Sequence, residues 1–405
     1  MSRLKVALFS DSHYEANGVA RTTCALEHYA RHRNLQLLSV HAGPITRRTI
    51  EGSIIRLELK RSRYSAFRIE HDLQFDVLLW RHVRRVLYEL RAFAPDVLHF
   101  TGPSDIGLMG VYAGYRLGIP LVGSWHTNLH EYAARRLDLG WLSIGAKRVV
   151  KRVVEQRVLD LCLLFYKLPH IVLAPNHEWQ QRLESATGLP TTVMSRGVDT
   201  ELFTPNHRTR TDTIINIGYV GRLSPEKSVR VLPQLDRALT EAGLGKKVRF
   251  TIVGHGNERE WLERHMPDAM FTGVLTGDRL SSAFANMDLL VFPSQTETVG
   301  NVVLEALASG VPVVAMAQGG PQFVGATREA AELASDHDEM MALVINLVRD
   351  HRRRDAMRKT ARTWAEGRSW DSIFDGVYRD YAEAVTSPSS SRIAPVAEVR
   401  HHRVG

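Results

Sequence analysis

Residues 289–315 read LLVFPSQTETVGNVVLEALASGVPVVA, and this stretch decides the fold class. The apolar run 289–292 predicts a strand that is buried on both faces, and the run 312–315 predicts a second one. Between them, the sequence from Gly300 or Asn301 to Gly310 has the pattern of a short helix with a glycine at its carboxyl end. A strand, a helix and a strand in this order indicate a parallel α/β sheet.

The same alternation recurs along the rest of the chain. Short apolar runs that predict buried strands lie at 6–10, 96–100, 121–125, 171–174, 214–220 and 249–253, with helical patterns among them such as 75–92 and 144–166. A polar segment at 204–212 interrupts the alternation and indicates a linker. We therefore expect two Rossmann-like domains, 1–203 and 204–369, that face a cleft in which ligands bind.

The end of the chain differs from the rest. A last amphipathic helical pattern covers 370–386. The segment 387–405 is rich in serine and proline and then basic, so we expect it to be disordered.

Composition narrows the class of protein. Hydrophobic residues make up 44% of the 405 residues and charged residues 24%, which is typical of folded soluble chains and excludes collagen-like and disordered classes. Two cysteines, Cys24 and Cys162, exclude a disulfide scaffold and suit a reducing compartment. Asp11 interrupts the first apolar run, which argues against a signal peptide, and no run is long enough to span a bilayer. We expect a cytoplasmic protein.

The net positive charge comes from the first half of the chain. Residues 1–200 hold 27 basic and 18 acidic residues, a net of +9, whereas residues 201–405 hold 25 and 26, a net of −1. The basic residues concentrate at 61–91 and 135–157, with tryptophan and aliphatic residues among them. These segments either form solvated helix faces or dock the first domain on an anionic membrane at its inner face. No nucleic-acid-binding motif is present, so nucleic acid is not an expected partner.

The helix that follows residue 300 is the strongest candidate for an anion site. The N–H groups of Gly300, Asn301 and Val302 are expected to point into the cleft with the helix dipole behind them, as a diphosphate requires. Glu297 precedes this helix and Glu305 lies inside it, so two carboxylates can accept hydrogen bonds from sugar hydroxyls on either side. Alternatively, Glu297 caps the helix and Glu305 is a solvated helical residue.

Two further cations follow the first strand of the second domain. Arg222 and Lys227 lie in the loop GRLSPEKS at 221–228, where fixed cations would neutralise a pyrophosphate leaving group. Alternatively, they belong to a solvated turn. Because two cations can serve the diphosphate, we expect neither a metal ion nor a cofactor. The sequence DHD at 336–338 has the spacing of a metal–diphosphate motif, but its position before a helical pattern predicts a helix cap.

Two sites are expected in the first domain. His126 follows the strand 121–125, and an imidazole at a strand tip can donate to developing negative charge. Alternatively, it is a structural histidine that bonds to the backbone. Gly18 lies in the turn after the first strand, where the backbone can approach a phosphate or an acceptor.

These motifs together resemble those of retaining glycosyltransferases of the GT4 group, which have the two-domain GT-B fold. The pair Glu297 and Glu305 is similar to the group's Glu-x7-Glu motif, the segment 221–228 to its Gly-Arg-Leu-x-Pro-Glu-Lys-Gly loop, and the segment 124–128 to its His-Thr motif. Ser228 stands where glycine is usual, which leaves the path of that loop in doubt. The neighbourhood at 271–294 is similar to the branch of α-mannosyltransferases and sulfoquinovosyl- and glucosyl-lipid synthases.

The resemblance implies a role for each candidate residue. Glu297 positions the sugar hydroxyls, Glu305 contacts the ribose, and His126 lies at the reaction centre. The backbone around Leu275 contacts the nucleotide base, or Leu275 merely packs on the core. Further expected positions are the loop residue Asn17 beside Gly18, the cleft cation Arg196, and the helix 370–386, which crosses back to the first domain.

The resemblance also implies the activity. We expect a retaining hexosyltransferase, with mannose from GDP-mannose as the best guess, that acts on a hydroxyl of a lipid or glycan acceptor. The open alternatives are a glycolipid synthase that uses UDP-glucose or another UDP-sugar, an NDP-sugar epimerase on the same fold, and a non-enzymatic protein that binds anionic surfaces or nucleic acid.

Overall fold

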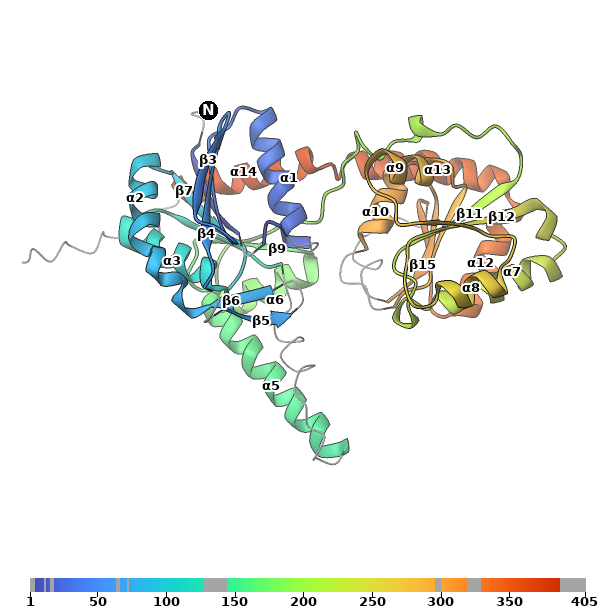
Figure 1. Ribbon diagram of the computed structural model, residues 1–405, viewed down its shortest axis with the longest axis horizontal. Helices are drawn as coiled ribbons and strands as arrows, with labels where there is room; N and C mark the ends of the chain where they lie inside the picture. The colour runs from blue at the N-terminus through green and yellow to red at the C-terminus, as the bar shows by residue number, and fades with distance from the viewer. Residues whose placement is uncertain are drawn as a thin grey trace, which may run out of the picture. The chain divides into compact units, whose positions relative to one another are not determined.

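The computed structural model of the chain describes residues 4–10, 12–14, 18–62, 66–70, 73–126, 144–295, 300–318 and 329–386 (Figure 1). It divides into two compact units. The first comprises Met1–Ser195 and Ile373–Gly405, and the second comprises Arg196–Ser372.

The first unit is built on a sheet of eight strands in its described part. Their order is β10-β9-β8-β7-β1-β2-β4-β3, and neighbours are parallel except β3, which is antiparallel to β4. Four of the strands are apolar runs buried on both faces, as the sequence predicts. The bounds are β1 Val6–Ser10, β2 Leu37–Gly43, β3 Arg47–Glu51, β4 Ile54–Lys60, β7 Val97–Phe100, β8 Leu121–Ser124, β9 Ile171–Ala174 and β10 Thr191–Val193.

Helices cover the faces of this sheet. They are α1 Gly18–His32, α2 Val83–Phe93, α3 Asp105–Leu117, α5 Ile144–Phe165 and α6 His177–Thr187, and a separate hairpin is formed by β5 Ala66–Glu70 and β6 Leu73–Asp76. The helical stretch expected at 75–92 is confirmed from residue 77, but it is divided: β6 is followed by the 3₁₀ helix η1 Val77–His82 and then by α2. Asp76 causes the break, because its carboxylate accepts from the Leu78 N–H over 3.0 Å and starts a new helix.

Helix α5 has two dissimilar halves. Its carboxyl half packs on the core through Leu159, Cys162 and Phe165. Its amino half projects from the first unit (Figure 1), and Val149 and Val153 are exposed there. None of the helices in the described ranges combines the length and the apolar character needed to cross a bilayer.

The second unit has a parallel sheet in the order β13-β12-β11-β14-β15-β16. Its strands are β11 Ile215–Val220, β12 Val248–Val253, β13 Met270–Gly273, β14 Leu289–Phe292, β15 Val313–Met316 and β16 Ala331–Ala334. Its helices are α7 Leu232–Glu241, α8 Arg259–His265, α9 Gly277–Ala285, α10 Asn301–Ala308, α12 His337–Arg349 and α13 His351–Glu366, and its 3₁₀ helices are η2 Pro205–His207, η3 Pro225–Lys227, η4 Val229–Val231 and η5 Gly245–Lys247. The strand, helix and strand predicted from residues 289–315 are β14, α10 and β15.

The last helix, α14 Trp370–Thr386, begins in the second unit and packs on the first. The Tyr29 hydroxyl donates to the Asp375 carboxylate over 2.6 Å, and the Thr192 hydroxyl donates to Asp380 over 2.9 Å. Phe374 and Tyr381 are fully buried. The expected return of this helix to the first domain is therefore what the structure shows.

The second unit starts earlier than the polar segment at 204–212 suggests. Val198 and Phe203 belong to the core of the second unit, so the chain has already joined that unit before residue 204. The polar segment itself is held to this unit by ion pairs of Arg208 and Arg210 with Asp288, at 2.8 and 3.0 Å. Its polarity reflects these ion pairs rather than a free linker.

Candidate active site

Two loops at the carboxyl edge of the second sheet are packed backbone to backbone. Gly254 follows β12 with a φ of +138°, and a Cβ there would lie 1.9 Å from the carbonyl oxygen of Gly221. The Gly221 N–H donates to the Val253 carbonyl over 3.0 Å. Only glycine allows this close approach, so the loop that carries Arg222 has a fixed path.

That loop presents both predicted cations. The Arg222 side chain is exposed, and its backbone carbonyl accepts a hydrogen bond from the Tyr219 hydroxyl over 2.9 Å. Lys227 is half-buried at the end of η3, and its N–H donates to the Ser224 carbonyl over 3.1 Å. The structure therefore places Arg222 and Lys227 on one ordered loop after β11.

Ser228 resolves the doubt about the path of this loop. It has φ +53° and ψ +29°, the left-handed conformation that glycine adopts without strain. The serine thus keeps the backbone conformation of the usual glycine, at an energetic cost.

The amino end of α10 is the second part of the site. Gly300 has a φ of +72° and no side chain with which to cap the helix. The first N–H groups of a helix have no acceptor within it, so those of Asn301 and Val302 have no partner inside α10. Because β11 and β14 are hydrogen-bonded neighbours in a parallel sheet, the loop after β11 and residues 293–295 after β14 leave the same edge of the sheet.

The two predicted glutamates have different outcomes. Glu297 lies outside the described residues. Glu305 is inside α10 and only 9% exposed, so the alternative that it is a solvated helical residue is wrong. Its place in a binding role stays a prediction.

The remaining predicted positions belong to separate elements. Leu275, in the segment between β13 and α9, packs against the core, as its structural alternative holds. Gly18 is the first residue of α1, and its carbonyl accepts from the Thr22 hydroxyl over 3.0 Å. Arg196 is the half-buried first residue of the second unit. Asn17 lies outside the described residues.

His126 lies directly after β8 in the first unit. Its Nε2 is 2.8 Å from the Ser124 Oγ, which is in turn 2.7 Å from the Nε2 of His99. The other nitrogen of His99 is 2.7 Å from the hydroxyl of Tyr381. His126 is thus bonded to a side chain and not only to backbone.

Sequence reasoning missed His99 and Tyr381. The available signal was a histidine inside the apolar run VLHF, since a polar group in a doubly buried strand must find a partner. The partner itself, 282 residues away on α14, could not be found from the pattern.

The first unit also contains a buried ionic cluster that the sequence did not reveal. Glu27 of α1 is 2.7 Å from the Arg56 Nε and 3.2 Å from the His13 Nε2. Burial alone would raise the pKa of Glu27, but hydrogen bonding from His13 and the pairing with Arg56 lower it to about 2. His41 stacks on His13 with ring centroids 4.1 Å apart, and burial lowers its pKa to about 3.

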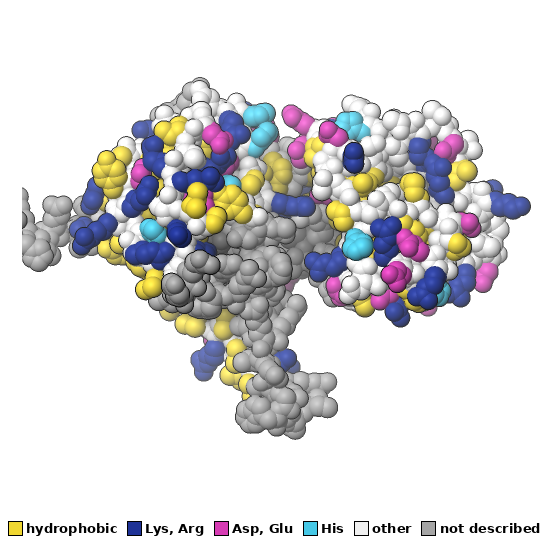
Figure 2. Space-filling model, in the orientation of Figure 1, with side chains coloured by type: hydrophobic (Ala, Val, Ile, Leu, Met, Phe, Trp, Pro, Cys, Tyr) yellow, Lys and Arg dark blue, Asp and Glu magenta, His cyan; other side chains and the backbone are white. Residues whose placement is uncertain are grey.

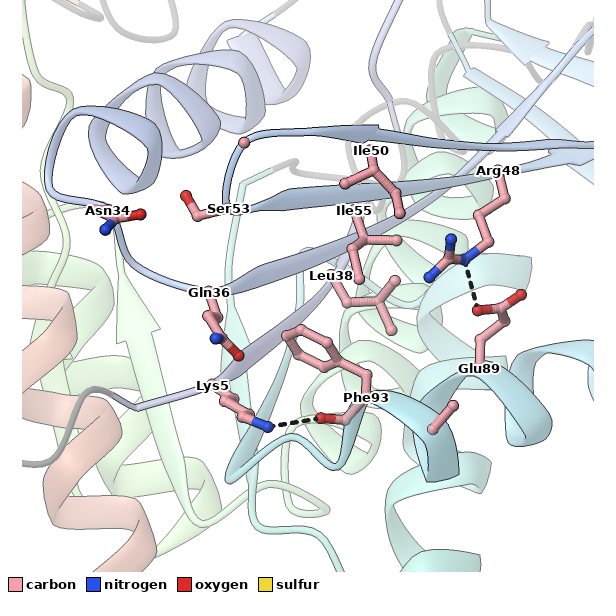
Figure 3. Close-up of a pocket in the computed structure, with 12 residues that line it drawn as sticks. Lys5, Asn34, Gln36, Leu38, Arg48, Ile50, Ser53, Ile55, Glu89 and Phe93 are labelled. Atoms are coloured by element: carbon pink, nitrogen blue, oxygen red, sulfur yellow. Dashed lines mark hydrogen bonds and ion pairs between the residues drawn. The ribbon is translucent and has the colours of Figure 1, made fainter.

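A cavity of about 540 Å³ lies at the opposite, amino edge of the first sheet (Figure 3). Its charged groups are paired with each other or with backbone: the Arg48 Nε donates to Glu89 over 3.0 Å, and the Lys5 Nζ donates to the Phe93 carbonyl over 3.4 Å. None of the predicted site residues lines it, so it is separate from the candidate active site.

Residues 336–338 act as the predicted helix cap. The Asp336 carboxylate accepts from the Glu339 N–H over 2.8 Å at the start of α12. Within the described ranges, no group of three or more His, Cys, Asp or Glu side chains is arranged to hold a metal ion.

Comparison with known families assigns both halves of the chain. Residues 16–202 match the family described as Glycosyltransferase Family 4, and residues 215–350 match the family described as Glycosyl transferases group 1.

Individual relatives agree with these matches. The chain is 34% identical over 328 residues to a GDP-mannose-dependent alpha-mannosyltransferase of Mycobacterium tuberculosis (strain CDC 1551 / Oshkosh), covering 76% of this chain and 78% of the relative. It is 29% identical to the sulfoquinovosyl transferase SQD2 of Arabidopsis thaliana, covering 71% of this chain and 56% of the relative. The crystal structure of Anabaena HepE in complex with UDP has a TM-score of 0.65 at 17% identity and covers 94% of this chain and all of that one. This last likeness confirms the predicted two-domain α/β fold.

Proposed function

Since this chain belongs to the group 1 and family 4 glycosyltransferases and is a hexosyltransferase of the GT-B fold, we propose that it moves mannose from GDP-mannose to a hydroxyl group of a lipid or glycan acceptor, with retention of configuration.

The observation that supports the proposed donor site is that two candidate anion-binding features follow neighbouring strands of the second unit. The fixed loop with Arg222 and Lys227 follows β11, and α10, which Gly300 precedes without a side-chain cap of its own, is the next helix after the neighbouring strand β14. Two cations and a helix amino end at one edge suit a nucleoside diphosphate.

The same groups support the departure of the diphosphate. As the bond between the sugar and the diphosphate breaks, negative charge develops on the leaving phosphate oxygen. Arg222, Lys227 and the amides of Asn301 and Val302 stabilise that charge. Because these groups neutralise the diphosphate, the proposal assigns no metal ion and no cofactor to the reaction.

Retention requires the acceptor hydroxyl to attack the face from which the diphosphate leaves. In the route implied by the family, the departing diphosphate accepts the acceptor's proton. In this proposal Glu297 positions the sugar hydroxyls, Glu305 contacts the ribose, and His126 acts at the reacting centre. The burial of Glu305 and the oriented Nε2 of His126 support these two assignments.

The choice of donor follows the relatives. The mannosyltransferase of M. tuberculosis supports GDP-mannose. A UDP-sugar is the second candidate, since HepE was crystallised with UDP and SQD2 is a sulfoquinovosyl transferase. A screen of nucleotide sugars with the purified chain, read as nucleotide release, separates the two. Interconversion of an NDP-sugar without an acceptor would instead identify an epimerase.

The acceptor side of the proposal uses the first unit. Lys and Arg side chains are spread over the face of this unit that Figure 2 shows, and α5 presents exposed Val149 and Val153 beside exposed Arg152 and Arg157. A basic helix with exposed apolar residues suits peripheral attachment to the anionic inner face of a membrane, where a lipid-linked acceptor lies. Salt-insensitive partitioning onto anionic vesicles, or none, would contradict this attachment.

Lys227→Ala tests the diphosphate role. We expect a loss of transfer of about 100-fold or more, with the fold intact by circular dichroism, because a leaving-group cation acts mainly in the transition state. Lys246→Ala is the matched control: it removes an exposed lysine that precedes β12 at the amino edge of the same sheet. Transfer at the wild-type rate by Lys227→Ala would refute the assignment.

A further inference from the structure

Four polar side chains form a continuous hydrogen-bonded chain inside the first unit. Tyr381 Oη on α14 is 2.7 Å from His99 Nδ1 on β7. His99 Nε2 is 2.7 Å from Ser124 Oγ at the end of β8. Ser124 Oγ is 2.8 Å from His126 Nε2. The chain thus joins the last helix to the histidine placed at the reaction centre.

The three inner members are shielded from water. His99 is 2% exposed, and Ser124 and Tyr381 are fully buried. Burial lowers the pKa of His99 to about 3, so its imidazole is neutral and has one N–H donor and one acceptor nitrogen. Burial also raises the pKa of Tyr381 well above its usual value, so its hydroxyl keeps its proton.

These protonation states fix which group donates in each of the hydrogen bonds. Among the described residues, the Tyr381 hydroxyl has no acceptor other than His99 Nδ1, and a buried O–H without an acceptor is costly. Tyr381 therefore donates to Nδ1, and the neutral His99 donates from Nε2 to Ser124.

Ser124 then has one proton left to donate. It can reach His126 Nε2 at 2.8 Å or the Phe100 carbonyl at 3.4 Å, and the shorter contact is the stronger bond. His126 Nε2 is accordingly an acceptor, and the proton of the neutral imidazole is on Nδ1.

We propose that Tyr381, His99 and Ser124 are positioning residues that set the tautomer of His126, with Tyr381 as the origin of the hydrogen-bond direction. This rests on the proposed function for the role of His126 in transfer, but the tautomer itself is a property of the free protein. It also assigns to α14, which begins in the second unit, a direct link to the reaction-centre histidine.

The first test is nitrogen NMR of the ¹⁵N-histidine-labelled protein near neutral pH, with the His126 signals assigned by loss in His126→Gln. We expect the wild type to show a protonated Nδ1 and a bare Nε2 at His126. Ser124→Ala and Tyr381→Phe should move the signals toward the Nε2-protonated form. A wild-type His126 protonated on Nε2, or unchanged signals in both variants, would overturn the proposal.

Tyr378→Phe is the matched control. Tyr378 lies one turn earlier on α14, its ring contacts that of Tyr381, and its buried hydroxyl has no partner among the described residues. The same substitution there should leave the His126 signals and the rate of transfer unchanged. A shift equal to that of Tyr381→Phe would show that the effect is one of packing and would overturn the assignment.

The second test is kinetic. Tyr381→Phe and Ser124→Ala should lower kcat by about tenfold, the effect of one oriented hydrogen bond, with KM for the donor unchanged. Thermal unfolding checks that both variants are folded, and the NMR of the wild type decides the tautomer even if one is not. Failure of every nucleotide sugar as a donor would refute the proposed function alone, whereas transfer with unaltered kcat in both variants would refute the positioning role alone.

Discussion

The carboxyl edges of the two sheets are formed by different kinds of group, backbone in one unit and side chains in the other. In the second unit, the edge is formed mainly by backbone: Gly221 packs on Gly254, and Gly300, which has no side chain, precedes α10. In the first unit, the corresponding region is formed by buried side chains, such as the cluster around Glu27 and the hydrogen-bonded chain through His99. The charge follows the same division, with +9 in residues 1–200 and −1 in residues 201–405.

This difference fits the two tasks proposed above, the binding of the diphosphate by the second unit and of the acceptor by the first. A diphosphate presents the same oxygens whatever sugar it carries, and a backbone frame with a few cations is sufficient to hold it. An acceptor is recognised by its particular hydroxyls and shape. An edge made of side chains can be changed residue by residue without altering the sheet beneath it.

A substitution at Gly254 tests the backbone packing of Gly254 on Gly221 in the second unit. Gly254→Ala should destabilise this unit by about 3 kcal/mol or more, because the new Cβ would meet the Gly221 carbonyl and the φ is unsuited to alanine. Urea unfolding measures the change. Gly243→Ala is the control, since Gly243 also has a positive φ but no atom within 4 Å of its Cβ position, and it should cost only about 1 kcal/mol.

The side-chain edge of the first unit should be the more acid-sensitive. Burial lowers the pKa of His41 and of His99 to about 3, below the 6.5 of an unfolded histidine. Each therefore adds stability that is complete above pH 6.5 and is lost as the pH falls toward 3, by about 1.4 kcal/mol per pH unit. Glu27, with its pKa of about 2, adds a loss that begins only below about pH 4.5.

In the second unit, the loss of stability on acidification starts at a lower pH. Burial would raise the pKa of Asp288, but the Asn216 N–H and the nearby arginines lower it from 3.8, so its contribution is lost only below about pH 4. Hydrogen-exchange protection factors measured between pH 7 and 4.5 should fall in the first unit and not in the second. His41→Phe should make the fall shallower. Equal falls in both units would contradict this account.

The smallest expected effect concerns Ser228. Ser228→Gly should stabilise the second unit by about 1 kcal/mol, because it removes the strain of a left-handed serine, and it should leave transfer intact. Ser224→Gly is the control, since Ser224 has φ −145° and ψ 157° and gains nothing from glycine. A lower thermal midpoint for Ser228→Gly would show that the serine side chain contributes bonds that outweigh the strain.

The sequence predicted an element correctly where a single physical requirement determined its residues. The runs at 289–292 and 171–174 match β14 and β9 because a doubly buried parallel strand must be apolar throughout. The edge strand β3, with the sequence RRTIE, was missed because its side chains are mostly exposed and charged. The start of the second unit was placed too late because the arginines of 204–212 read as solvated, whereas they pair with Asp288.

The same limit applies to the candidate site. Arg222, Lys227 and Gly300 lie where their motifs placed them, since each is defined by its own strand end. The partners of His126 depend on contacts between β7, β8 and α14 that no local pattern contains. Sequence reasoning found the residue at the tip of the strand but not the network behind it.

The return of α14 has a consequence for synthesis of the protein. The second unit is one uninterrupted segment, whereas the first is completed only by residues from Ile373 onward. Until α14 leaves the ribosome, the core that Phe374 and Tyr381 cover is open, and His99 Nδ1 lacks the Tyr381 hydroxyl. The second unit can therefore finish folding first, and the first unit, although most of it is made earlier, must wait for the residues from Ile373 onward.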